Sequence, residues 1–127
     1  MNDKNFEKFE ITQSITFKHM HTVGGYITFH IVVKSGQFSG ASSFCISETD
    51  LTEKIIVLKE LYNSLSGSCH IHDYDSDGFM LFEMGSWGHM TISGQIGGTH
   101  SEQYLVYRFM SDQTILAEVI SSLKKML

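Results

Sequence analysis

Residues 88–127 read GHMTISGQIGGTHSEQYLVYRFMSDQTILAEVISSLKKML, and this stretch decides the fold class of the 127-residue chain. Apolar and polar residues alternate over residues 88–95 and 103–110, which is the pattern of half-buried β-strands. Ser111 or Asp112 is then placed to cap a helix. The apolar stripe of this helix has the helical period and consists of Ile115, Leu116, Val119, Ile120, Leu123 and Leu127. Strands that lead directly into a helix predict an α+β domain.

The upstream part of the chain has the same plan. Residues 26–34 and 38–46 alternate as strands do, with glycines at the turns before and between them. A helix is expected next, because Ser47 and Asp50 have capping-box spacing and Gly67 stands where a C-terminal cap belongs. The apolar stripe of this helix comprises Leu51, Ile55, Leu58, Tyr62 and Leu65. Strands over residues 68–73 and 79–84 follow, and the second is apolar on both faces, which predicts that both faces are covered.

We therefore expect one domain, residues 1–127, with about seven or eight antiparallel strands and two amphipathic helices at about 48–66 and 112–126. A short strand pair opens the chain, built on Phe9, Ile11, Ile15 and Phe17. The order is compatible with two pseudo-repeated β-β-β-α halves, since SGQFSG at residues 35–40 echoes SGQIGG at residues 93–98. Shared turn chemistry is the simpler explanation of that echo.

Charge and composition narrow the class of partner. The formal net charge of −5 argues against nucleic acid, which favours a basic stripe, and suits a basic protein partner. Cys45 and Cys69 are too few for a disulfide framework, so we expect buried free thiols. No apolar run approaches the roughly 20 residues of a membrane span, and residues 1–10 lack a signal-peptide pattern. We expect a cytoplasmic protein with no membrane partner.

The segment DYDSDG, Asp73–Gly78, has the opening pattern of a calcium-binding EF-hand loop. That loop requires a bidentate glutamate at its twelfth position, which here is Met84, while Glu83 comes one residue early. The flanking residues also have strand patterns where an EF-hand has helices. We therefore expect an acidic hairpin turn and no calcium cofactor.

Four histidines could share one sheet face. His30, His70, His72 and His89 all fall on the polar side of their predicted strands. If these strands belong to one sheet, its open face could gather imidazoles and, with Asp73, hold a transition metal. Histidine is also an ordinary residue of a half-exposed sheet face, so we expect no resident metal.

The sequence contains no recognisable catalytic arrangement. No serine has the glycine-flanked setting of a nucleophile elbow, and Gly94–Gly98 lacks the phosphate-loop pattern. Trp87 is either a core residue or an exposed partner anchor, and the sequence favours the core. We therefore expect a protein that is not an enzyme.

Several segments, taken in order, resemble the WapI-like family of bacterial immunity proteins over roughly residues 20–127. The most specific are GHMTISG at residues 88–94 and SDQT at residues 111–114. Weaker matches are Gly24-Gly25-Tyr26, Phe38-Ser39-Gly40, Asp50-Leu51 and Leu65-Ser66-Gly67. The resemblance implies a non-catalytic protein that neutralises a cognate toxin domain in the producing cell, the best-known such toxin being a tRNA-cleaving nuclease.

The leading hypothesis is thus an inhibitor that binds a basic toxin surface. We expect Asp73, Asp75 and Asp77, with Glu83 nearby, to form the contacting patch. The alternative is a small metal-binding or enzymatic domain that uses the histidine-bearing sheet face, and a domain with an unknown ligand is a third reading.

Overall fold

Seven strands and two helices make up residues 12–127, the part of the chain that this computed structural model describes. In chain order they are β1 (Thr12–Val23), β2 (Tyr26–Gly36), β3 (Phe38–Ser47), α2 (Glu48–Ser64), β4 (Gly67–His72), β5 (Phe79–Met84), the single 3-10 turn η1 (Ser86–Gly88), β6 (His89–Ile96), β7 (Leu105–Asp112) and α3 (Gln113–Lys124). The predicted α+β class is confirmed, as are both helices.

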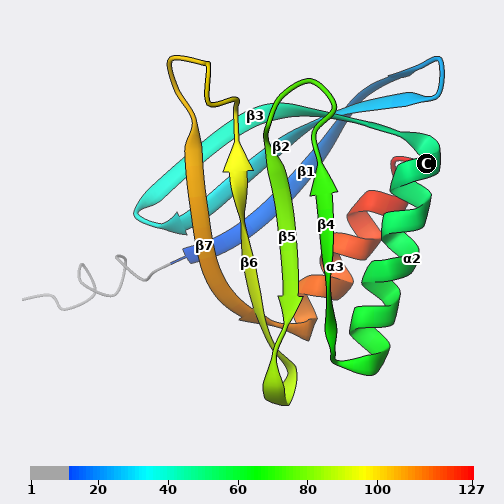
Figure 1. The fold of residues 1–127 in the computed structure, drawn as a ribbon, viewed down its shortest axis with the longest axis vertical. Helices are drawn as coiled ribbons and strands as arrows, with labels where there is room; N and C mark the ends of the chain where they lie inside the picture. The colour runs from blue at the N-terminus through cyan, green and yellow to red at the C-terminus, as the bar shows by residue number, and fades with distance from the viewer. Residues whose placement is uncertain (1–11) are drawn as a thin grey trace, which may run out of the picture.

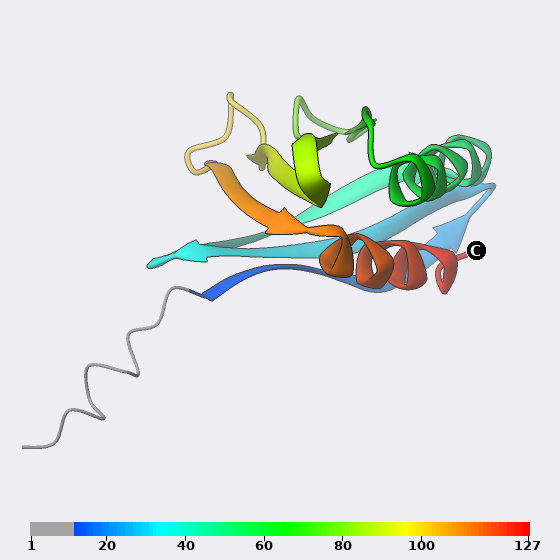
Figure 2. The ribbon, with the colours of Figure 1, turned by 90° about the horizontal axis from the view of Figure 1, so that it is seen from below.

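The strands form two antiparallel sheets, one in each half of the described chain. The first has the order β1-β2-β3 and the second the order β4-β5-β6-β7. Each sheet is followed by its helix, so the second half has one strand more than a strict β-β-β-α repeat. The sheets lie in separate layers, and both helices lie at the same side of the molecule, where α2 runs beside β4 (Figures 1 and 2).

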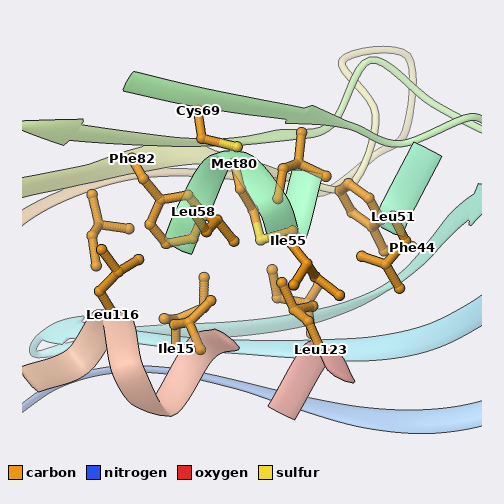
Figure 3. Close-up of a cluster of buried hydrophobic side chains, with 14 of the residues drawn as sticks. Ile15, Phe44, Leu51, Ile55, Leu58, Cys69, Met80, Phe82, Leu116 and Leu123 are labelled. Carbon is orange, nitrogen blue, oxygen red and sulfur yellow. The ribbon is translucent and has the colours of Figure 1, made fainter. Parts of the chain in front are cut away.

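The core lies between the two sheets and the helices. On β2 the alternating apolar residues Ile27, Phe29, Ile31 and Val33 are all buried. Figure 3 shows side chains from both sheets and both helices meeting in this cluster, among them Ile15, Leu58, Phe82 and Leu116. Neither helix of residues 12–127 has the length and apolar character that a membrane span requires.

The outer face of the second sheet is open. Met80, Phe82 and Met84 of β5 are buried, whereas Phe79 and Leu81 on the opposite face are only half-buried. No helix or strand of residues 12–127 lies over that face (Figures 1 and 2). The prediction that β5 is covered on both sides is therefore wrong, because α2 packs beside β4 and α3 lies on the inner side of the sheet, next to β1 (Figures 1 and 2).

Two details at element ends also differ from prediction. The C-terminal cap of α2 is Leu65, which adopts the left-handed conformation at φ 56 and donates its N–H to the carbonyl of Leu61 at 2.9 Å. Gly67, the predicted cap, begins β4 instead. At the other end of the chain, Ile15 and Phe17 lie on one continuous strand, and the predicted strand at Phe9 and Ile11 lies outside the described residues.

Candidate partner-binding surface

The acidic turn between β4 and β5 is held in place by its first aspartate. Asp73 is buried, and its Oδ1 accepts hydrogen bonds from the N–H groups of Cys45 at 2.9 Å and Asp75 at 3.1 Å. Its Oδ2 accepts from the Ser76 hydroxyl at 2.5 Å. Since Cys45 belongs to β3, this carboxylate joins the turn to the edge of the first sheet. Asp73 is thus a structural residue of the turn.

Asp77 performs a similar task on the other side of the turn. Its Oδ1 accepts from the side-chain amide of Gln95 at 3.2 Å and from the N–H of Thr99 at 2.9 Å. These bonds fasten the β6–β7 loop to the turn. Of the three predicted aspartates, Asp75 and Asp77 are both exposed, and Asp75 is the one whose carboxylate accepts no hydrogen bond from residues 12–127.

Two tyrosines and a second aspartate lie beside Asp75. The Tyr74 hydroxyl donates to Asp50 Oδ2 at 3.0 Å and lies 3.1 Å from Ser47 Oγ. Its ring meets that of Tyr26 edge to face, with centroids 6.1 Å apart. Both rings are about half exposed, at 51% for Tyr26 and 48% for Tyr74. We call Tyr26, Asp50, Tyr74 and Asp75 the turn surface; sequence spacing could not reveal Tyr26 and Asp50, because they come from distant elements.

Negative charge continues from the turn surface into an open groove. The groove has a volume of about 820 Å³ and lies between β1, the first turn of α2 and the C-terminal residues. Its lining includes two acidic side chains, Glu48 and Glu53, and one lysine, Lys125. The N–H of Glu48 donates to the carbonyl of Gly25 at 2.8 Å and so fixes the β1–β2 turn against α2. This end of the molecule is therefore acidic over several elements.

Glu83 does not belong to this surface. It is exposed on the outer face of β5, where it pairs with Ser68 and Thr91. The turn precedes Phe79, so at about 3.3 Å per residue Glu83 lies roughly 15 Å along the strand from it. Because Glu83 is close to the aspartates in sequence, we expected a single acidic patch. The extended conformation of β5 instead places Glu83 away from the turn.

The four candidate histidine ligands are divided between the sheets. His30 lies on β2, whereas His70 and His72 lie together on β4 with ring centroids 4.0 Å apart. Partial burial, and then the neighbouring His72, lowers the pKa of His70. His89 is at the start of β6, opposite Asp112. Among residues 12–127 no three His, Cys, Asp or Glu side chains are placed to hold a metal ion, so the convergence that the metal-binding alternative requires is not found there.

Trp87 is the clearest departure from the sequence prediction. It lies in the tight turn between β5 and β6 and is 94% exposed, where the core was expected. Its φ of 63 lies in the left-handed region, which costs a residue with a side chain about 1–2 kcal/mol. The flanking Gly85 and Gly88 are the sequence signal that could have placed it in a turn.

The model of the Immunity protein WapI-like family matches residues 4–127. No curated protein and no solved structure matches the chain.

Proposed function

The chain belongs to the WapI-like immunity protein family, and on that premise we propose that it is a non-catalytic inhibitor that binds a cognate toxin domain in the producing cell. We further propose that the toxin domain is a nuclease and that the turn surface contacts it. Immunity in such a protein requires only a stable complex that blocks the toxin.

The turn surface supports this proposal through its charge. A nuclease must hold a phosphate backbone and so presents basic residues. Asp75 and Asp50, with Glu48 and Glu53 in the adjoining groove, offer the opposite charge. Complementary fields speed association and select the partner. Tyr26 and Tyr74 add half-exposed rings, a residue type enriched in interfaces.

The rigidity of the turn supports the same conclusion. The hydrogen bonds of Asp73 and Asp77 tie the turn to β3 and to the β6–β7 loop. A surface that is already ordered loses little conformational entropy when a partner binds. These hydrogen bonds are the observation that carries the assignment to the turn, because they hold in place a turn that exposes the side chains of Asp75 and Asp77.

Asp75→Lys tests the proposal. The probe is the toxin domain expected to be encoded beside this gene, co-expressed and purified with the immunity protein. We expect a stoichiometric complex whose association slows as salt is added. Asp75→Lys should weaken binding by about tenfold or more, mainly through the association rate. The thermal midpoint of the free protein should not change, because the Asp75 side chain is exposed.

Glu118→Lys is the matched control, since Glu118 is exposed on α3 and outside the turn surface. It makes the same change in charge and should reduce binding much less. Equal losses in the two variants would show that only net charge matters and would remove the turn from the interface. Failure of the wild-type protein to bind the toxin domain would refute the function itself.

A further inference from the structure

Trp87 does not contribute to the folded core. It is the single tryptophan of the chain, and 94% of its surface is exposed. Its left-handed backbone conformation, at φ 63, is one that glycine adopts freely and that a bulky residue disfavours. A residue that is unfavourable for the turn and is left almost wholly exposed by residues 12–127 gives the fold little packing in return.

The hairpin holds Trp87 in a defined position. Directly below the turn, Met84 pairs with Met90 and both are buried. The N–H of Gly85 donates to the carbonyl of His89 at 2.7 Å and closes the turn. The base of this hairpin turn is therefore anchored in the core, and Trp87 is attached to an ordered backbone.

The neighbouring residues form a small surface around the tip. Glu83 pairs with Thr91, and Thr91 pairs with Met110 on β7, so all three share the outer face of the sheet, one residue further from the turn than the Met84–Met90 pair. Met110 is 61% exposed and Glu83 is also exposed. We call Trp87, Glu83 and Met110 the tip surface; the exposed pair of His89 and Asp112 borders it, so two carboxylates, Glu83 and Asp112, lie at its edge.

We propose that Trp87 is the anchor with which this protein binds its toxin domain, its indole entering an apolar socket that is bordered by basic residues. This inference rests on the proposed function. Tryptophan is the residue most enriched among those that dominate binding energy, because its large ring buries much area with few rotatable bonds. The basic border of the socket pairs with Glu83.

A single toxin domain can reach both the tip surface and the turn surface. Both lie at the ends of β5, whose six residues span about 20 Å. An interface of ordinary size covers about 800 Å² on each partner and is thus roughly 30 Å across. The open outer face between them carries the half-buried side chains of Phe79 and Leu81. We therefore place the toxin domain across this face of the second sheet, whose strands are drawn in Figure 1.

Trp87→Gly tests the inference, because glycine keeps the left-handed turn and removes the ring. We expect the thermal midpoint to stay the same or rise, while affinity for the co-purified toxin domain falls about 100-fold, mostly through faster dissociation. Trp87→Asn, which also tolerates the left-handed region, guards against loosening of the hairpin and should give the same loss. Phe38→Ser is the control, since Phe38 is 72% exposed at a different hairpin and should leave affinity unchanged.

A second readout follows the ring directly. The protein labelled with 5-fluorotryptophan has one fluorine signal, because it has one tryptophan. Unlabelled toxin domain should shift that signal in a saturable way. If wild-type protein binds but the Trp87 variants bind within threefold of it and the fluorine signal is unmoved, the anchor is refuted and the proposed function stands. If wild-type protein does not bind, the proposed function fails and the anchor with it.

Discussion

Tyr107 buries its hydroxyl without a hydrogen-bond partner among residues 12–127. The residue lies on β7 directly opposite Gly94 of β6. A Cβ added to Gly94 would lie only 2.6 Å from the Tyr107 hydroxyl oxygen, so the missing side chain provides the room that the phenol ring occupies. Burial raises the pKa of Tyr107 well above its usual value of 10. Gly94, part of the strand motif of the family, thus has a packing role.

Tyr107→Phe should stabilise the protein by about 1 kcal/mol. The substitution removes a buried hydroxyl that has lost its hydrogen bonds to water and gained none in return, while the ring keeps its packing. Urea denaturation of the two proteins measures the change. Tyr104→Phe is the control, because Tyr104 is 49% exposed and its hydroxyl can remain hydrated. A loss of stability in Tyr107→Phe would mean that the hydroxyl has a stabilising partner after all.

Single residues were predictable from sequence where their chemistry is local. Ser47 and Asp112 cap their helices as expected, because a capping side chain needs only the N–H groups two or three residues ahead. Leu65 and Trp87 were mispredicted, since both take left-handed conformations that their residue type disfavours. For such residues the surrounding turn decides the conformation, and the nearby glycines, Gly67 for Leu65 and Gly85 and Gly88 for Trp87, indicate a turn without showing which residue becomes left-handed.

Among the elements, α3 depends on the charge of its N-cap. The Asp112 carboxylate accepts a hydrogen bond from the N–H of Thr114 at 2.9 Å. Hydrogen bonds from the side chain and then the backbone of Thr114 hold the pKa of Asp112 below its ordinary value of 3.8. The folded state therefore favours the charged form. The stability that the charged form contributes is fully present above about pH 4, the pKa of this aspartate in the unfolded chain. It is lost as the pH falls through the lower pKa of Asp112 in the folded protein.

Asp112→Asn should remove this pH dependence and keep the cap. Asparagine is an equally good N-cap residue but does not titrate. We expect the difference in unfolding free energy between wild type and variant to shrink as the pH is lowered from 5 to 2, in a series of urea titrations. Ser111→Ala is the control, because Ser111 was the other predicted cap and has no titratable group. A difference that stays constant with pH would show that the cap charge does not contribute.

The elements themselves were predictable, whereas their assembly into sheets was not. Hydrophobic periodicity identified the strands and both helices because period 2 and period 3.6 are visible along the chain. Which strands share a sheet depends on contacts between distant residues. His30 and His70 both fall on the polar side of their strands, but these strands belong to different sheets. The metal hypothesis failed because it required the histidines to share one sheet. The turn surface escaped prediction for the same reason, since Tyr26, Asp50 and Tyr74 come from separate elements.

At the scale of the whole molecule, the two halves share one core. Each half forms its own sheet, yet Ile31 from the first and Ile92 from the second belong to the same buried cluster. Neither sheet could bury its inner face without the other. We therefore propose that the chain unfolds as one cooperative unit, whatever the origin of the β-β-β-α pattern in its two halves.

Ile31→Val and Ile92→Val test that cooperativity, because each removes one methylene from a side chain that is at most 1% exposed. Each should lower the unfolding free energy by about 1 kcal/mol. Two probes follow the loss in urea: far-UV circular dichroism for both sheets, and thiol labelling of Cys69 for the second. Burial raises the pKa of Cys69 to about 11, so the native thiol resists labelling at neutral pH. If the chain is one cooperative unit, each variant should lower the urea midpoint, and the two probes should report the same midpoint for that variant. If Ile31→Val shifted the dichroism but left the protection of Cys69 unchanged, the halves would be separate folding units.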